Sequence, residues 1–166
     1  WLVVSTDGEP VTASNGLMMT PTTRLADAID VDLVFVCGGV NVREAVSPAL
    51  VTVLRRLAAR RTPLGALCTG GYALAQAGLL DGYHATIHWE NLPALREEFP
   101  RVQINDQVFS IDRDRYTCSG GTAPLDLMLN RIALTHGDDL ATKVSEQCIV
   151  DRIRGPHDRQ RMPLRG

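Results

Sequence analysis

Cys68 is the residue of this sequence best placed to do chemistry. It follows the short apolar run 63–67 and precedes Thr69-Gly70-Gly71, after which an apolar helical pattern begins. A strand that turns sharply into a helix exposes the residue at the turn, and the helix N-terminus can stabilise a thiolate there. The pattern predicts a strand-to-helix elbow whose thiol is a nucleophile or whose backbone binds an anion. The alternative is a small buried hydrophobic residue, since free cysteines are often buried.

His88 is the second candidate, twenty positions further along the chain. It ends the short apolar strand predicted at 85–87, so a parallel sheet would bring it to the same edge as the elbow. There it could orient a thiol or a ligand carboxylate, or be a structural histidine whose ring is already hydrogen-bonded. Trp89 could hold a quaternary ammonium group by cation–π attraction, or belong to the core or to a dimer interface.

Gly38 and Gly39 close the apolar run 31–37, which is typical of a strand buried on both faces. Ligands of doubly wound α/β folds bind beyond the carboxyl ends of the strands, where helix N-termini point their free amides. We therefore expect the two glycines, the elbow and His88 to share one cavity. Asp126 is left out of this site, because the helix dipole alone favours an acidic residue in a first helical turn.

Strands and helices alternate along almost the whole chain. Helical spacing of apolar residues predicts helices at 47–60, 72–77, 91–99, 124–135 and 137–150. Strands are expected at 1–5, 31–37, 63–67, 85–87, 108–111 and 116–118, and a hairpin at 11–19 with a tight two-residue turn at Asn15-Gly16. This order predicts an α/β three-layer sandwich with a mainly parallel, doubly wound, flavodoxin-like sheet.

Composition narrows the classes of protein further. The 166 residues, 45% of them hydrophobic, suit one domain, and a net charge of -2 disfavours a surface that binds DNA by itself. Neither a secretory leader nor an apolar stretch of about 18 residues is visible. We therefore expect a cytoplasmic protein without a membrane segment. Its cysteines form no CxxC pair, so no zinc site is expected, and we predict no cofactor; the cysteines are Cys37, Cys68, Cys118 and Cys148.

Three motifs resemble the PfpI and class I glutamine amidotransferase-like superfamily: Val36-Cys37-Gly38-Gly39, Gly65-Ala66-Leu67-Cys68-Thr69-Gly70 and Thr86-Ile87-His88-Trp89. Within it, further segments are similar to the sensory domain of AraC-type transcription regulators: 77–82, His88-Trp89 and 116–123. The similarity covers nearly the whole chain and is nearest to regulators of carnitine, glycine betaine or arginine catabolism.

The resemblance implies a division of the chain. Residues 1–150 would form the ligand-sensing domain, with the family's usual first strand and helix absent before Trp1. Residues 151–166 would be a linker toward a C-terminal helix-turn-helix domain that lies outside this sequence and alone contacts DNA. A homodimer is expected.

The resemblance also implies the roles of the site residues. The backbone amides of Gly39 and Thr69 would bind an anion, next to Gly38, with Cys68 and His88 lining the pocket. As a sensor, the domain would have no catalytic residue and would bind a small effector that carries a carboxylate and a cationic amine, the latter meeting Trp89 and Glu90. As an enzyme, it would use Cys68 as nucleophile and His88 as general base in an amidase, hydratase or glyoxalase-like lyase.

Overall fold

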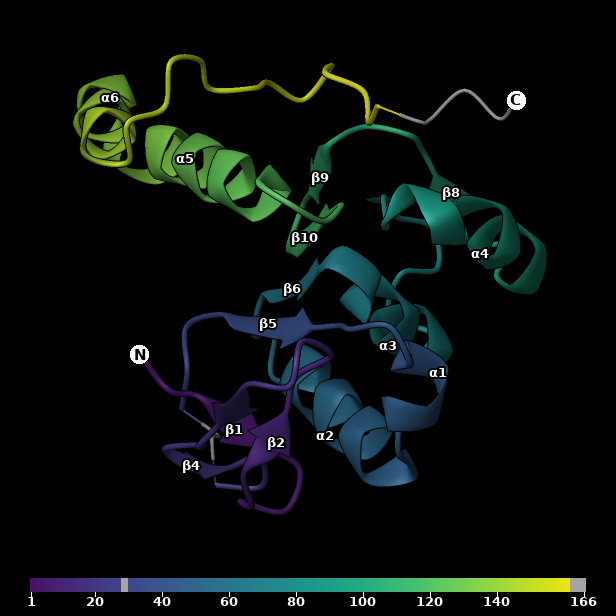
Figure 1. Ribbon diagram of the computed structural model, residues 1–166. Coiled ribbons are helices and arrows are strands. Elements are labelled where there is room, and N and C mark those ends of the chain that lie inside the picture. The colour runs from purple at the N-terminus through teal and green to yellow at the C-terminus, as the bar shows by residue number, and fades with distance from the viewer. Residues whose placement is uncertain (28–29, 162–166) are drawn as a thin grey trace.

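A four-stranded sheet forms the centre of the molecule in the computed structural model, which describes residues 1–27 and 30–161 (Figure 1). Its strand order is β5-β6-β10-β9, with β5 at Val34–Cys37, β6 at Leu64–Leu67, β10 at Arg115–Cys118 and β9 at Phe109–Asp112. Strands β5 and β10 run parallel to β6, and β9 runs antiparallel to β10. The carboxyl ends of β5, β6 and β10 therefore meet at one edge.

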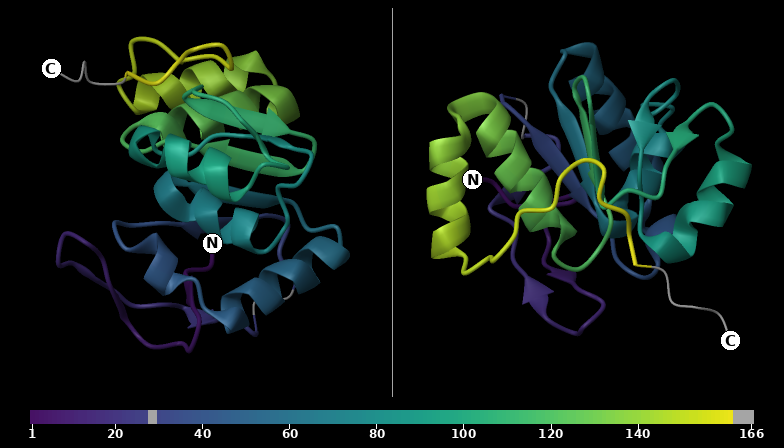
Figure 2. Two further views of the ribbon diagram at one scale, coloured as in Figure 1. Left: turned by 90° about the vertical axis from the view of Figure 1, so that its right-hand side faces the viewer. Right: turned by 90° about the horizontal axis from the view of Figure 1, so that it is seen from above.

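Helices cover both faces of this sheet (Figure 2). Helices α1 (Val42–Ala45), α2 (Pro48–Ala59) and α3 (Gly71–Gln76) lie on one side, and α5 (Ala123–His136) and α6 (Asp138–Gln147) lie on the other. Side chains of β6 alternate between the two layers, since Leu64 and Ala66 join the core under α2 while Leu67 packs toward the core under α5. The predicted three-layer sandwich is confirmed.

Helix α2 shows how local sequence sets these elements. The Ser47 side chain caps its first turn by accepting a hydrogen bond from the Leu50 amide at 3.2 Å, and Pro48 suits the first helical position. Leu54 and Leu57 are buried on one face. The chain leaves the helix through Arg61, whose φ of 62° is left-handed.

Smaller elements surround the main sheet. Three strand pairs lie outside it: β1 (Val4–Ser5) with β4 (Thr23–Arg24), β2 (Val11–Thr12) with β3 (Met18–Met19), and β7 (His84–Ala85) with β8 (Gln103–Ile104). The remaining elements are the 3-10 turns η1 (Cys68–Gly70) and η2 (Trp89–Asn91) and the helix α4 (Leu92–Glu98). The loop of the β2-β3 hairpin spans 13–17, with hydrogen bonds from Ala13 to Leu17 and from Gly16 to Ala13. The hairpin prediction is correct, but its two-residue turn is wrong, because Gly16 has a positive φ and Asn15 does not.

Strand β5 departs from the sequence-based expectation. The run 31–37 was expected to be buried on both faces, yet β5 begins only at Val34, its residues are partly buried, and Cys37 is exposed. The reason is its place in the sheet, because β5 is an edge strand of the four. An apolar run is compatible with an edge position when one face still packs on the core.

The tail of the chain lies on the domain. Residues 152–161 form no helix and run from α6 past α5 and β9, as the yellow segment of Figure 1 shows. Gln107 and Arg159 form an isolated antiparallel bridge, and the Val108 amide donates to the Asp158 carbonyl at 2.8 Å. The predicted linker, 151–166, is therefore docked as far as it is described, and 162–166 lie outside the described residues.

Candidate functional site

Cys68 forms the elbow that its sequence surroundings predict. It follows β6 directly and opens η1, and its φ of 57° lies in the left-handed region that residues other than glycine rarely adopt. Such a conformation costs about 1 kcal/mol or more, and strained residues of this kind cluster at functional sites. This conformation turns Cys68 out of the strand direction at the end of β6.

Two glycines allow the chain to pass close to the elbow. A Cβ atom on Gly70 would lie 2.2 Å from the Val36 carbonyl oxygen, and one on Gly38 would lie 2.1 Å from the Gly70 nitrogen. The Thr69 hydroxyl donates a hydrogen bond to the Gly39 carbonyl at 2.6 Å. The end of β5 and the elbow after β6 are thus joined, and the first part of the expected cluster is present.

His88 faces the same point as the thiol. A Cβ atom on Gly120 would lie 2.9 Å from His88 Cδ2 and 3.1 Å from Cys68 Sγ, so both side chains border this glycine. The His88 amide also donates to the Cys68 carbonyl at 3.4 Å. Gly120 is not among the site residues that the sequence predicted. Its position two residues after Cys118, at the end of the strand beside β6, is the signal that could have found it.

Glu90 and Trp89 lie beside His88 on the outer side of the site. The Glu90 carboxylate oxygen Oε2 is 3.5 Å from His88 Nδ1, and 63% of the Glu90 side chain is exposed. The Trp89 ring centroid is 5.7 Å from that of His88, and the ring also packs against the apolar core. The structure therefore adds one exposed negative charge and one aromatic ring to the thiol and the imidazole.

The surroundings of Cys68 raise the pKa of its thiol. Partial burial raises the pKa of Cys68, the nearby charge of Glu90 raises it further, and a hydrogen bond from the Thr69 amide opposes them. The Thr69 amide at the start of η1 favours the thiolate, as expected of a helix N-terminus, but burial outweighs it in the direction of the pKa shift. A neutral thiol is a poor nucleophile unless a base removes its proton.

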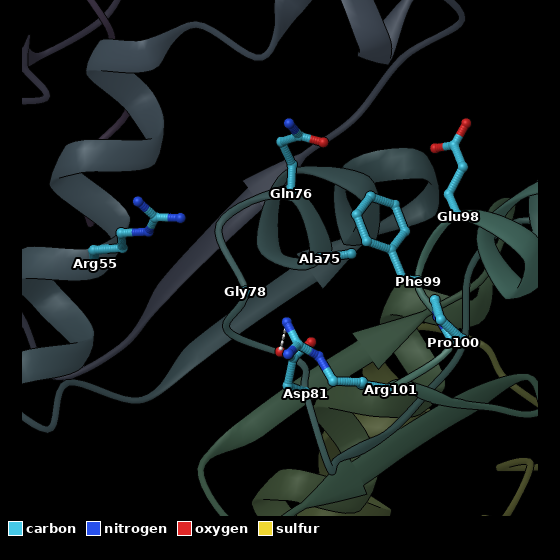
Figure 3. A pocket seen from close by; sticks show the side chains of 9 residues that line it. All are labelled: Arg55, Ala75, Gln76, Gly78, Asp81, Glu98, Phe99, Pro100 and Arg101. Atoms are coloured by element: carbon cyan, nitrogen blue, oxygen red, sulfur yellow. Dashed lines mark ion pairs between the residues drawn. The ribbon is translucent and has the colours of Figure 1, made fainter.

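The two best-formed hollows of the described residues lie away from the elbow. One, of about 260 Å³, lies between α2, the end of α3 and the segment after α4 (Figure 3). Its charged wall is already paired, since Arg101 bonds Asp81 at 2.8 Å. The other lies between β9 and α5. Neither hollow includes Cys68, His88 or Gly120.

No group of three histidine, cysteine or acidic side chains is arranged to hold a metal ion among residues 1–27 and 30–161. Within the same ranges, every helix is too short or too polar to cross a bilayer.

Fold and site together define a flavodoxin-like α/β protein with a cysteine at a strand-to-helix elbow. The model of the DJ-1/PfpI family matches residues 1–134, and the chain belongs to this family. The predicted superfamily is thereby confirmed.

Relatives of the chain include both regulators and an enzyme. It is 50% identical over 165 residues to the HTH-type transcriptional regulator GbdR of Pseudomonas aeruginosa, a match that covers 99% of this chain and 45% of that protein. It is 34% identical over 142 residues to the isonitrile hydratase of Pseudomonas putida, covering 83% of this chain and 60% of the enzyme. The chain thus spans about half the length of the regulator it matches.

A solved structure agrees with this grouping. The crystal structure of an AraC family transcriptional regulator from Pseudomonas putida superposes with a TM-score of 0.80 at 34% identity, covering 87% of this chain and 78% of that one. The flavodoxin-like fold predicted from the sequence and the resemblance to AraC-type regulators are both confirmed.

Proposed function

We propose that this chain is the ligand-sensing domain of an AraC-family transcription regulator and that it binds its effector at the Cys68 elbow. The observation that carries the proposal is the strained elbow itself, where a neutral thiol and an imidazole border one glycine in a chain half identical to a transcription regulator. Residues 1–150 would be the sensor and 151–166 the connection to a DNA-binding domain. The protein would work in the cytoplasm as a homodimer.

The effector class follows from the groups at the site. The Thr69 amide is oriented to donate to the Cys68 sulfur, and the hydrogen bond from the Thr69 hydroxyl to the Gly39 carbonyl holds the Gly39 backbone against the elbow. The Thr69 and Gly39 amides would bind a carboxylate. The exposed carboxylate of Glu90 and the ring of Trp89 would meet a cationic amine. Glycine betaine, carnitine and arginine each carry both groups.

Thermal unfolding in the presence of these three compounds tests the proposal. A ligand at about a hundred times its Kd adds about 2.7 kcal/mol to the free energy of unfolding. Choline is the matched control, because it keeps the quaternary ammonium group and lacks the carboxylate. Glu90→Gln should weaken the response to the cationic ligands while leaving the unliganded melting temperature unchanged. No shift with any of the three compounds would refute the effector class.

The second candidate is a Cys68-dependent enzyme, an amidase, hydratase or glyoxalase-like lyase. The convergence of Cys68 and His88 favours it, as does the similarity to an isonitrile hydratase. It requires His88 to remove the thiol proton, because the pKa of Cys68 is raised. Cys68→Ser separates the two functions: an enzyme would lose turnover, whereas a sensor would keep ligand-dependent stabilisation.

A further inference from the structure

The strap, residues 152–160 of the docked tail, is anchored to the domain at two residues, Arg154 and Gln160. At the first anchor, the Arg154 amide donates to Asp126 Oδ1 and its Nε to Asp126 Oδ2, both at 2.9 Å. Asp126 is only 4% exposed. Arg154 Nη2 also donates to the Thr122 hydroxyl at 2.7 Å, and the Asn130 side chain donates to the Arg154 carbonyl at 2.8 Å. Arg154 is thus hydrogen-bonded to three residues of α5 and its N-terminal cap: Thr122, Asp126 and Asn130.

The second anchor is Gln160. Its Nε2 lies 2.9 Å from the Thr86 hydroxyl, 2.9 Å from the Ile87 carbonyl and 3.0 Å from the Gln107 carbonyl. Among the described residues, the Gln160 side-chain oxygen is buried without a hydrogen-bond partner. An anchor with an unsatisfied buried oxygen is weaker than its three donated contacts suggest, because the oxygen regains water when the strap leaves.

Both anchors attach to segments that form the walls of the Cys68 site. Ile87 immediately precedes His88, and Thr122 follows Gly120 by two residues. His88 and Gly120 are the two residues that border the thiol. The strap therefore contacts both segments that border the thiol, one through Ile87 next to His88 and the other through Thr122 near Gly120.

The internal contacts of the strap are polar and local: a turn between Gly155 and Asp158, and an ion pair between Arg152 and Asp158 at 2.6 Å. The strap contains Gly155 and Pro156, forms no helix or strand, and is held by polar contacts across its length. Segments with few buried apolar contacts open at lower free energy than the core. Loss of the Gln160 contacts is thus a local event that leaves the sheet intact.

We propose that the strap is a latch coupled to the Cys68 site. A ligand that displaces His88 or Gly120 would weaken the Gln160 and Arg154 anchors and release the strap. By linkage, releasing the strap loosens the walls around the thiol. The identity of what the strap signals to, a DNA-binding domain, rests on the proposed function, whereas the coupling between strap and site does not.

Alkylation of Cys68 by iodoacetamide tests the latch without an effector. In the 166-residue chain, Gln160→Ala should raise the alkylation rate of Cys68 roughly fivefold, a typical size for coupling between sites. Mass spectrometry would report each cysteine, with exposed Cys148 as internal reference. Arg159→Ala is the matched control: the substitution keeps the backbone bridge to Gln107 and removes an exposed side-chain ion pair to Asp106 at 3.5 Å, so the rate should stay unchanged.

A second variant, Gln160→Glu, is expected to raise the Cys68 alkylation rate more than Gln160→Ala does. Gln160→Glu keeps the length of the side chain but places a carboxylate against the Ile87 and Gln107 carbonyls, so it should release the strap more fully than alanine. Unchanged far-UV circular dichroism and an accelerated Cys68 reaction in both variants would support the latch. Equal Cys68 rates in the wild-type chain and both variants would overturn it.

The reverse direction is measured by limited trypsin digestion. A carbamidomethyl group on Cys68 should speed cleavage after Arg154 and Arg159 roughly fivefold, because coupling is reciprocal. The Cys68→Ser chain, treated with the same reagent, controls for modification of other cysteines. Unchanged strap cleavage would refute the latch.

Failure of the latch and failure of the proposed function are distinguishable. Ligand-induced stabilisation without strap-dependent thiol reactivity would leave the sensor and remove the latch. Strap-dependent reactivity without a response to glycine betaine, carnitine or arginine would keep the latch and remove that effector class.

Discussion

The backbone turns at different positions after the carboxyl ends of two neighbouring parallel strands, β6 and β10, and this difference explains the site. Cys68 follows the end of β6 and is half-buried on the sheet edge, whereas Cys118 is the last residue of β10 and is fully buried. At β6 the cysteine itself takes the left-handed conformation. At β10 the strand continues through Cys118, and the left-handed residue is Gly121, three positions later.

This difference decides the environment of each thiol. Cys118 keeps the strand conformation and packs into the cluster with Phe109 and Leu127 under α5. Burial there raises the pKa of Cys118 to about 12. Cys68, turned out of the strand by its backbone, reaches His88 and Gly120 instead. Cys118, at the level of Leu67 in the register, is still a strand residue and shares the core cluster with Leu67, whereas Cys68 lies one position beyond the end of β6 and is turned toward the site.

Alanine at the glycines of the two exits should give the largest contrast in stability. Gly70→Ala should cost about 4 kcal/mol or prevent folding, because its Cβ would meet the Val36 backbone at 2.2 Å. Gly121→Ala, with no atom within 4 Å of its Cβ and a φ of 65°, should cost only about 1 kcal/mol. Urea unfolding measures both. Equal losses would show that the close passage at the elbow is not what distinguishes the two exits.

Glycine in place of each cysteine should show the next largest difference. Cys118→Gly removes a fully buried side chain and adds backbone freedom in a strand, for a loss of about 2–3 kcal/mol in the free energy of unfolding. Cys68→Gly relieves a left-handed residue and should lie within about 1 kcal/mol of wild type. A loss at position 68 as large as that at 118 would contradict the strained conformation of the elbow.

Alkaline pH should destabilise the protein through Cys118. In the unfolded chain this thiol ionises near its ordinary pKa of about 8.5, whereas the folded protein holds the proton to about 12. The stabilisation is complete below the unfolded pKa and is lost as pH rises toward the folded one, with a slope of up to about 1.4 kcal/mol per pH unit. Chemical denaturation between pH 8 and pH 10.5 should give a flatter profile for Cys118→Ala. Parallel profiles for the two chains would be inconsistent with a buried, protonated Cys118.

The smallest stability effect is expected at Gly120. Its added methyl group in Gly120→Ala would meet only side chains, at 2.9 Å from His88 and 3.1 Å from Cys68, and these can shift at a cost of about 1 kcal/mol or less. The same methyl group would fill the space in front of the thiol, so iodoacetamide should modify Cys68 more slowly than in wild type. Gly121→Ala is the control for this rate. An unchanged Cys68 rate in Gly120→Ala would argue against a site bordered by this glycine.

The amino-acid pattern alone was enough for the sandwich, the elbow and the pairing of Gly38-Gly39 with Cys68-Thr69. These features depend on local signals: an apolar run ends in glycines, and a parallel sheet brings successive strand ends to one edge. His88 does lie beside Cys68, but the predicted reason is wrong: β7 ends at Ala85 and pairs with β8 in a separate two-stranded sheet, and His88 reaches the elbow from the segment that follows β7. The ligand-binding roles of these residues, with Trp89 and Glu90, stay predictions.

Other features required the tertiary structure, because each depends on segments far apart in the chain. The edge position of β5 follows from strand order, which no apolar run encodes by itself. The raised pKa of Cys68 comes first from burial, which outweighs the opposing hydrogen bond from the Thr69 amide, and burial depends on the tertiary structure. The docking of Arg154 on Asp126 and of Gln160 on Thr86 pairs polar residues 28 and 74 positions apart, a spacing without any periodic signal in the sequence.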